Sequence, residues 1–330
     1  MDIKNLEKIL EEEPRYRLKQ AKSAVFKDLI DDWQQAKVLP QELRRKLGED
    51  CPLQIEARVF DSPDGAAKAI STLRDGLKIE SVLLWHAGGR NTVCVSSQAG
   101  CPLGCQFCLT GKIGFKRNLD YFEIVEQVLF FARFLRKDKQ KITNIVFMGM
   151  GEPFLNYDNV LEAIKTLNDK DGFNLGARHF SISTVGITEG IEKLAEEKLQ
   201  VNLAVSLHAP DDESRFKIMP INKQYPLERI LGAVRNYIEK TKRRVMFEYI
   251  MIKDVNDSDE YAKKLAKLLS KVTPSFVNLI SYNPTGIFKP SSVQRIKKFK
   301  EILEKEGVSV TQRHRFGQDL KAACGQLGNC

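Results

Sequence analysis

Apolar runs alternate with amphipathic stretches along most of this chain. The amphipathic stretches carry apolar residues at helical spacing, most clearly over 121–135 and 227–239. Between such stretches lie six short runs with the composition of buried strands: 92–96, 142–148, 180–184, 201–207, 245–250 and 276–280. Strands that alternate with helices in this way build a parallel sheet. Because six units are fewer than the eight of a closed barrel, the pattern predicts an α/β protein with a partial, open (β/α)6 barrel.

The first ninety residues follow other patterns. Apolar residues at helical spacing between Leu18 and Trp33 predict a helix, and a second short helix starts after Pro40. Residues 51–90 have strand-like segments, LQIEARVF and KIESVLLW, with a Ser-Pro-Asp-Gly turn between them. We therefore predict three parts. A small helical domain over 1–50 docks a partner or caps the main domain, a strand-and-turn extension covers 51–90, and the barrel covers 91–330.

Length, hydropathy and cysteine usage narrow the class of protein. A chain of 330 residues with 42% hydrophobic content can bury a large core. No run of 18 uncharged apolar residues occurs, and the amino-terminal MDIKNLEKILEEE lacks the apolar segment of a signal peptide, which predicts a cytoplasmic protein without membrane association. Seven unevenly placed cysteines suit metal or redox chemistry in a reducing compartment better than a secreted disulfide scaffold.

The charge balance leaves nucleic-acid binding open. The formal net charge is +9, and because the first fifty residues hold eleven charges of each sign, the whole excess lies in 51–330. Basic residues cluster at 133–141, 240–244, 295–300 and at Arg313 with Arg315. Such clusters can form a surface for a polyanion, although charged runs on helices are often only solvated faces.

Three cysteines spaced C-x3-C-x2-C lie in the glycine-bearing segment GCPLGCQFCLTG. Thiolates from Cys101, Cys105 and Cys108 can hold three corners of a [4Fe-4S] cluster, whereas a cluster held entirely by protein takes four cysteines, so one iron stays open to another ligand. Two alternatives remain at this point: a zinc site of three sulfurs and a histidine, and a disulfide with a spare thiol. No histidine follows within twenty residues, but His86 lies fifteen residues before Cys101.

Small and polar residues follow the predicted strands. Carboxyl ends of parallel strands meet at one mouth of a barrel, and glycines there let a ligand approach the backbone. The segments concerned are GMGEP at 149–153, STVG at 183–186, SLH at 206–208 and YNP at 282–284. Their polar side chains, Glu152, Ser183, Ser206, His208 and Asn283, suit a cofactor with an amine, a carboxylate and a ribose. Each of them alone also fits a cap, a turn or a structural hydrogen bond.

These motifs carry a resemblance to a known family. In the family's order, and across nearly the whole chain, they are RNTVCVSSQAGCPLGCQFCLTG, VFMGMGEPFLN, SISTVG, AVSLHAP, MPINKQYP, FEYIMIKDVND, NLISYNP and CGQLG. The chain resembles radical S-adenosylmethionine (SAM) enzymes, and among them the bacterial dual-specificity adenosine C2 methyltransferases of 23S ribosomal RNA and transfer RNA. The cysteine spacing marks the superfamily, and the flanking Cys94 and Cys324 mark this branch.

The resemblance implies a cofactor set. Cys101, Cys105 and Cys108 hold one [4Fe-4S] cluster, and the amine and carboxylate of SAM chelate its open iron. One electron, from a donor such as flavodoxin or ferredoxin, then cleaves the cofactor to a 5′-deoxyadenosyl radical. The cofactor contacts implied are Gly151, Glu152, Ser183, Ser206, Leu207, His208 and Asn283.

The resemblance also implies roles for three residues outside the cluster loop. An adenine carbon has no nucleophilic lone pair for ordinary methyl transfer. In the family's scheme one SAM molecule methylates Cys324. A second SAM molecule supplies the radical that removes a hydrogen from this methyl group, so two are used per turnover. The resulting carbon radical on Cys324 then adds to the base. Cys94 then releases the base by forming a disulfide with Cys324. Glu80 accepts the proton that leaves the base, although the WHAGG loop after Glu80 departs from the family's sequence.

The partners implied are 23S ribosomal RNA and transfer RNA, bound by a monomer. Stacked adenines are shielded, so we expect an unpaired or splayed base to enter the mouth. Residues 1–50 resemble the family's RNA-docking domain, although their net charge is zero. The alternatives are methylation of carbon 8, as in the family's antibiotic-resistance relative, a radical activase that forms a glycyl radical on a protein, and a zinc-dependent RNA-binding protein. Cys51 and Cys330 lie in no motif, and we expect a buried filler and a frayed tail, respectively.

Overall fold

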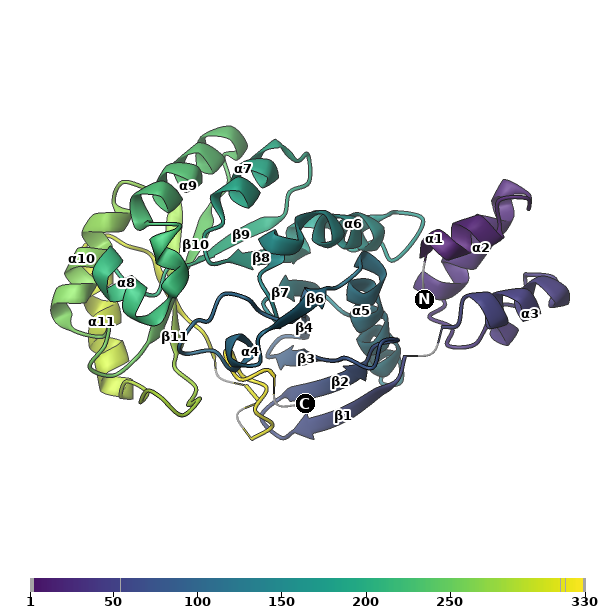
Figure 1. Ribbon diagram of the computed structural model, residues 1–330, viewed down its shortest axis with the longest axis horizontal. Coiled ribbons are helices and arrows are strands. Elements are labelled where there is room, and N and C mark those ends of the chain that lie inside the picture. The colour runs from purple at the N-terminus through teal and green to yellow at the C-terminus, as the bar shows by residue number, and fades with distance from the viewer. Residues whose placement is uncertain (1–2, 54, 315, 318, 329–330) are drawn as a thin grey trace.

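A ten-stranded sheet organises the protein in the computed structural model (Figure 1). The structure describes residues 3–53, 55–314, 316–317 and 319–328. Two residues named in the sequence predictions lie outside the described residues. They are Arg315, of the basic pair with Arg313, and Cys330, expected in a frayed tail. The strand order is β1-β2-β3-β4-β7-β8-β9-β10-β11-β12, and the strands from β4 onward are parallel.

All six predicted barrel strands form. They are β4 (Arg90–Val95), β7 (Asn144–Phe147), β8 (Phe180–Thr184), β9 (Asn202–Ser206), β10 (Val245–Met251) and β11 (Ser275–Ser281). A short seventh parallel strand, β12 (Val310–Gln312), was not predicted and pairs with β11. The sheet begins at β1 and ends at β12, which confirms an open α/β barrel.

Amphipathic helices follow the parallel strands and pack on the outside of the curved sheet (Figure 1). The main helices are α5 (Tyr121–Arg136), α6 (Tyr157–Asn168), α7 (Thr188–Glu196), α9 (Leu227–Thr241), α10 (Asp259–Leu269) and α11 (Val293–Lys305). The shorter ones are α4 (Leu109–Lys112), α8 (Asp212–Ile218), and the 3-10 helices η2 (Pro153–Asn156), η3 (Ala177–His179) and η4 (Pro220–Lys223). Helix α5 begins with a capping box, in which Asp120 and Glu123 satisfy each other's backbone amides. No helix among the described residues is long and apolar enough to cross a membrane.

An antiparallel extension continues the sheet beyond β4. It consists of β1 (Ala57–Ser62), β2 (Ala66–Thr72) and β3 (Lys78–His86), and β3 pairs antiparallel with β4. The segment after β12 returns to this extension, because Gly317 donates to both carboxylate oxygens of Asp64 at 2.7 and 2.9 Å. The two ends of the open sheet are therefore bridged by the last part of the chain.

Residues 3–50 form a helical unit at one side of the barrel (Figure 1). It contains α1 (Ile3–Ile9), α2 (Arg15–Phe26), η1 (Trp33–Gln35) and α3 (Gln41–Asp50). Arg133 of α5 donates to the carbonyls of Ile30 and Leu53, at 2.7 and 3.2 Å, and Arg136 donates to that of Asp28. Two arginines of the basic cluster at 133–141 thus hold the helical unit. Cys51 is buried, as expected.

Candidate active site

A hairpin holds the three cysteines of the C-x3-C-x2-C motif. Strands β5 (Gln98–Gly100) and β6 (Phe115–Asn118) bracket the loop, and the amide of Cys101 donates to the carbonyl of Gly114 at 3.2 Å. At Gly100 φ is +81°, and a Cβ there would lie 1.8 Å from the carbonyl oxygen of Gly114, so glycine is required for this close approach. Cys101, Cys105 and Cys108 are all free thiols, which contradicts the disulfide alternative.

The three thiols fit a cluster of several irons. Burial raises the pKa of Cys101 to about 12, and burial and the neighbouring thiols raise that of Cys105 as well. Thiolates here therefore need a strong positive charge beside them, which coordinated metal supplies. Across the described part of the chain, no three His, Cys, Asp or Glu side chains gather as a single metal ion would require. In a three-cysteine [4Fe-4S] site each sulfur binds a different iron, which three cysteines of one short loop can do.

The histidine of the zinc alternative lies elsewhere. The Nδ1 atom of His86 is 3.0 Å from a guanidinium nitrogen of Arg90, and its ring packs edge-on against Phe316 at 5.1 Å between centroids. These contacts lie at the turn that joins β3 and β4, where β4 begins. The cysteine loop follows the other end of β4, its carboxyl end. His86 is thus not placed to complete a site with the three cysteines.

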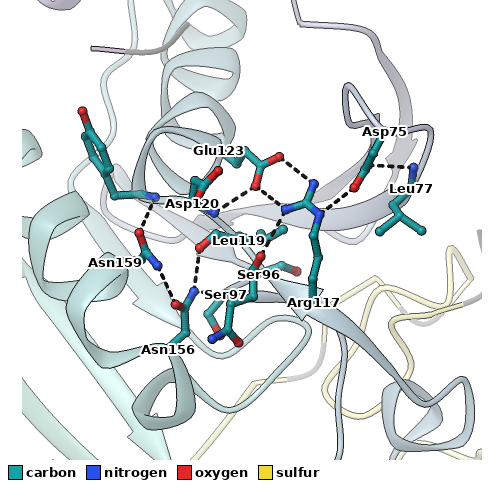
Figure 2. Close-up of polar contacts among 12 residues, drawn as sticks. Asp75, Leu77, Ser96, Ser97, Arg117, Leu119, Asp120, Glu123, Asn156 and Asn159 are labelled. Atoms are coloured by element: carbon teal, nitrogen blue, oxygen red, sulfur yellow. Dashed lines mark hydrogen bonds and ion pairs between the residues drawn. The ribbon is translucent and has the colours of Figure 1, made fainter. Parts of the chain in front are cut away.

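Figure 2 shows the polar network that fixes the base of the cysteine hairpin. Arg117 of β6 donates to both carboxylate oxygens of Glu123 on α5, at 2.7 and 2.9 Å, and to Asp75 in the β2–β3 turn at 2.6 Å. The side-chain amide of Asn156 donates to the carbonyl before β5 and to the carbonyl after β6, at 2.8 and 2.7 Å. The loop is therefore anchored to α5, to η2 and to the antiparallel extension.

The predicted residues at the end of β7 lie beside the hairpin. Glu152 is buried, and its two carboxylate oxygens accept the amides of Phe154 at 3.0 Å and Val185 at 2.8 Å. Burial raises its pKa to about 7. A Cβ at Gly151 would lie 2.5 Å from the side chain of Gln98 on β5, so glycine is required there too. An ammonium group placed against Glu152 would favour its charged form, as expected of a residue that holds the amine of SAM.

Three further strand ends contribute polar atoms. The hydroxyls of Ser183 on β8 and Ser206 on β9 lie 3.4 Å apart. The next residue, Leu207, is buried, and its carbonyl accepts a hydrogen bond from Arg215. Beyond β11, the Nδ2 of Asn283 donates to the carbonyl of Cys324 at 3.2 Å. The Oδ1 of Asn283 is buried and has no hydrogen-bond partner among the described residues. A buried acceptor without a donor is open to a ligand's hydroxyl or ammonium group, so the site fits a bound cofactor.

His208 connects the end of β9 with the cysteine loop. Its Nδ1 accepts the amide of Ile250 at 3.1 Å, and its ring meets that of Phe107, between two of the cysteines, edge-on at 5.0 Å. Burial, with a smaller contribution from Arg215, lowers the pKa of His208 to about 3. The imidazole is therefore neutral at pH 7. It packs against the loop and offers no positive charge to a ligand.

Arg215 is a buried residue of the site that the sequence analysis missed. Its guanidinium donates to the backbone carbonyls of Val185 at 2.6 Å, Ser206 at 3.2 Å and Leu207 at 3.0 Å. It thereby ties the ends of β8 and β9 together. In the sequence, Arg215 is only one charged residue of the helix after β9. Such an arginine can equally well lie on a solvated surface, so its burial could not be predicted.

The two flanking cysteines approach each other from distant parts of the chain. Cys94 is on β4 and Cys324 is in the segment after β12, and both are free. Burial, and next the negative charge of Cys324, raise the pKa of Cys94 to about 12. Arg313 lies with them, because its Nη1 donates to the Sγ of Cys324 at 3.3 Å. In the sequence, Arg313 stood out only as one of a basic pair with Arg315.

Glu80 lies on the same face as Cys94. In β3, Val82 is opposite Cys94, and residues two apart on a strand share a face. Glu80 is completely buried. The alternative to a functional role, that Glu80 is a strand residue facing solvent, is therefore wrong. Its Oε1 is 3.4 Å from the Nζ of Lys68, and its Oε2 accepts the amide of Gly328 at 2.9 Å. Lys68 was also missed in the sequence.

The segment 324–328 covers this group of residues. The carbonyl of Gly325 accepts the amide of Leu109, and the carbonyl of Leu327 accepts the hydroxyl of Thr110, at 2.8 and 2.7 Å. Both partners directly follow Cys108. Together with the contacts to Asn283 and Glu80, these bonds bring the cysteine loop, the strand ends, both flanking thiols and Glu80 to one mouth of the barrel.

Comparisons with known proteins agree with this arrangement. The model of the radical SAM superfamily matches residues 95–266. A protein of Dictyoglomus turgidum named "Probable dual-specificity RNA methyltransferase RlmN" is 47% identical over 96% of this chain and 91% of its own length. The "Dual-specificity RNA methyltransferase RlmN" of Nautilia profundicola is 42% identical over 96% of this chain and 93% of its own. The crystal structure of a radical SAM methyltransferase from Sphaerobacter thermophilus superposes with a TM-score of 0.95, at 42% identity, over 99% of this chain and 97% of that one.

The open barrel and its cysteine loop thus define a radical SAM enzyme, a class that carries a [4Fe-4S] cluster and uses SAM. Within that class, the chain belongs to the RlmN family of dual-specificity RNA methyltransferases.

Proposed function

We propose that the chain methylates carbon 2 of an adenosine in 23S ribosomal RNA through a methyl-cysteine intermediate, and that an adenosine of transfer RNA is a second substrate. Family membership supports RNA methylation. The observation that carries the mechanism is the pair of free thiols, Cys94 and Cys324, which meet beside the cysteine loop. Neither thiol is needed to hold a cluster, and together they suit the transfer of a carbon through a cysteine.

In this proposal Cys101, Cys105 and Cys108 hold the cluster. Glu152 binds the amine of SAM, and the other cofactor contacts are Gly151, Ser183, Ser206, Leu207, His208 and Asn283. The cluster and SAM, when bound, supply the methyl group and then the radical, with two SAM molecules used per turnover. The orphaned Oδ1 of Asn283 and the buried carboxylate of Glu152 support these assignments.

The carbon is carried by Cys324. Its thiolate accepts the methyl group, and removal of one hydrogen leaves a methylene radical on Cys324 that adds to carbon 2 of the adenine. The adduct is a radical and must lose one electron, which the cluster would take back when bound, and Glu80, buried on the same face as Cys94, accepts the proton from that carbon. The thiolate of Cys94 attacks the sulfur of Cys324 and forms a disulfide. The electron pair of the broken carbon–sulfur bond goes to the methylene carbon, which takes up a proton from solvent and leaves as the methyl group of the base. Reduction of this disulfide restores both thiols.

The RNA docks over the mouth and the helical unit. Residues 1–50 form the RNA-docking domain, 51–90 the linking extension and 91–330 the catalytic core. A monomer in the cytoplasm receives electrons from a flavodoxin or ferredoxin. Because the helical unit carries no net charge, it recognises the shape of the RNA more than its charge.

The test is nucleoside analysis after a reaction with anaerobically reconstituted enzyme. Ribosomal RNA is digested and its methylated adenosine is compared by mass spectrometry with carbon-2 and carbon-8 standards. We expect the carbon-2 product, and the carbon-8 product would contradict the assignment. A colourless, zinc-loaded protein without activity would reject the radical mechanism altogether.

Two cysteine variants test the intermediate. Cys94→Ala should trap RNA covalently on Cys324, because nothing resolves the thioether. Cys324→Ala should form no adduct, since it has no sulfur to carry the carbon. Denaturing gels followed by peptide mass spectrometry separate these outcomes. Equal turnover by both variants would refute the roles of the pair.

A further inference from the structure

Arg313 makes direct contact with a reacting atom of the proposed mechanism. It follows β12, and its backbone amide donates to the carbonyl of Leu279 at 2.9 Å. Its Nη1 donates to the Sγ of Cys324 at 3.3 Å. Its Nη2 donates to the Oε1 of Glu248 at 2.8 Å and lies 3.4 Å from the Sδ of Met148. The guanidinium thus spans the interior of the barrel between a carboxylate and the sulfur that accepts the methyl group.

The partner carboxylate holds the guanidinium in place. The side chain of Glu248, on β10, is only 4% exposed, and its Oε1 also receives the amide of Asn278 at 3.4 Å. Burial alone would lower the pKa of Arg313, but the charges of Glu248 and Cys324 raise it overall, so the group stays a cation. This ion pair, in which the carboxylate is buried and the guanidinium partly buried, fixes the position of Nη1 relative to the sulfur.

The charge of Arg313 opposes the effects that disfavour thiolates at this place. Burial and the neighbouring sulfur both act against a negative charge on Cys94, and Arg313 acts in the opposite direction. The thiolate, not the thiol, is the nucleophile in an attack on a methyl group. For Cys324 the geometry is direct, because the cation donates a hydrogen bond to the sulfur atom that reacts.

On these grounds, and resting on the proposed function, we propose that Arg313 is a catalytic residue that donates a hydrogen bond to the Sγ of Cys324 and orients it for methyl acceptance, with Glu248 as the positioning residue of its guanidinium. The thiol proton leaves to a base in solvent. A sulfur lone pair of Cys324 then forms the bond to the methyl carbon, and the electron pair of the broken carbon–sulfur bond returns to the leaving thioether, S-adenosylhomocysteine. Methylated Cys324 carries no negative charge, so its contact with Arg313 weakens once the methyl group is in place.

The experiment compares Arg313→Gln and Arg313→Lys with wild type and with Arg235→Gln, a control on the exposed pair of Arg235 and Glu228 on α9. The first measurement is the anaerobic alkylation rate of Cys324 by iodoacetamide at one fixed pH, followed by peptide mass spectrometry. The second is the rate at which reconstituted enzyme with SAM, without RNA, gains a methyl group on Cys324. We expect Arg313→Gln to slow both rates by at least about tenfold, as loss of a hydrogen bond to a charged group does. Arg313→Lys should recover part of each rate, and Arg235→Gln should match wild type.

Arg313→Gln leaves Glu248 buried without its cation and can fail to fold. Arg313→Gln/Glu248→Gln removes both charges at once, and the same loss of both rates is expected from it, with an unchanged thermal melt and iron content. Wild-type rates in either folded variant overturn the proposal. If wild-type enzyme gains no methyl group on Cys324 at all, the proposed function fails, and the alkylation rates still decide whether Arg313 activates this thiol.

Discussion

Lys68 and Glu80 form an ion pair in the interior of the protein, with 3.4 Å between Nζ and Oε1 and side chains that are 8% and 0% exposed. They project from the neighbouring strands β2 and β3, where Lys68 pairs with Val82 and Glu80 with Ile70, so that both lie on one face of the sheet. The second oxygen of Glu80 accepts the amide of Gly328. Two partners from distant parts of the chain thus fix the orientation of the carboxylate that we propose as the proton acceptor.

Lys68→Met should strongly destabilise the protein. The substitution leaves the Glu80 carboxylate buried without its cation, which typically costs about 3 to 5 kcal/mol of the free energy of unfolding. Urea denaturation at pH 7 measures this loss. Lys263→Met, at an exposed position of α10, is the control and should stay within about 0.5 kcal/mol of wild type. Lys68→Met/Glu80→Gln should recover most of the stability, and a single variant as stable as wild type would show that the pair is not tightly coupled.

His208 should make the protein less stable in mild acid. Its pKa is about 3 in the folded chain, below the unfolded value of 6.5. Burial lowers this pKa most, and the positive charge of Arg215 lowers it further. The unfolded state therefore binds more protons between these values. The contribution of the neutral imidazole is complete above pH 6.5 and is lost as the pH falls, by up to about 1.4 kcal/mol per unit.

His208→Asn tests this expectation. Asparagine tolerates the positive φ of 60° at this position and offers an acceptor to the amide of Ile250, but it does not titrate. Between pH 6.5 and 4.5, the free energy of unfolding of wild type should fall by roughly 2 to 3 kcal/mol more than that of the variant. Urea denaturation at three pH values gives the difference. Parallel pH profiles would mean that His208 is accessible to protons in the folded state.

Gly100→Ala should prevent the cysteine loop from holding iron. The added Cβ would lie 1.8 Å from the carbonyl oxygen of Gly114, so β5 and β6 cannot keep their pairing. Gly88→Ala is a matched control, since φ is +82° there and no atom lies within 4 Å of the added Cβ. It shares the backbone strain of about 1 kcal/mol without the clash. After anaerobic reconstitution, iron and sulfide per protein should fall by at least about half in Gly100→Ala only. Equal iron content in both variants would contradict the role of the hairpin.

Arg133→Met should loosen the helical unit from the barrel. The variant loses hydrogen bonds to the carbonyls of Ile30 and Leu53, worth about 1 kcal/mol each. Opening should become about thirtyfold more frequent, and proteinase K should cut around residues 51–56 correspondingly faster. Mass spectrometry of the fragments locates the cut. Arg235→Met is the control, and equal cutting rates in the two variants would place the attachment elsewhere.

The barrel strands and the cysteine loop were predictable because their signals are local. Each strand of the barrel is a short run rich in apolar residues between stretches with helical spacing, and the three cysteines lie within eight residues of one another. The strand-end residues were also accessible, since parallel strands place their carboxyl ends at one mouth. Ser183 and Ser206 came together in this way, with their hydroxyls 3.4 Å apart.

The missed elements depend on contacts that no local pattern encodes. Strand β12 has only three residues, and just one of them is apolar and partly buried. Lys68, Arg215 and Arg313 have the composition of surface residues, yet each is held by partners from other elements. A charged residue is buried only where tertiary structure supplies its counter-charge or hydrogen bonds, and one sequence does not reveal that partner.

The last part of the chain also constrains the order in which the site can assemble. The contacts of Asp319 with Ser62, of Gly317 with Asp64 and of Gly328 with Glu80 join residues 257, 253 and 248 positions apart. Pairings of such high contact order carry a large loop-closure entropy and form late in folding. The cysteine hairpin closes over fewer than twenty residues and can form early during synthesis on the ribosome. We therefore expect cluster insertion to precede the closure of the segment with Cys324 over the loop.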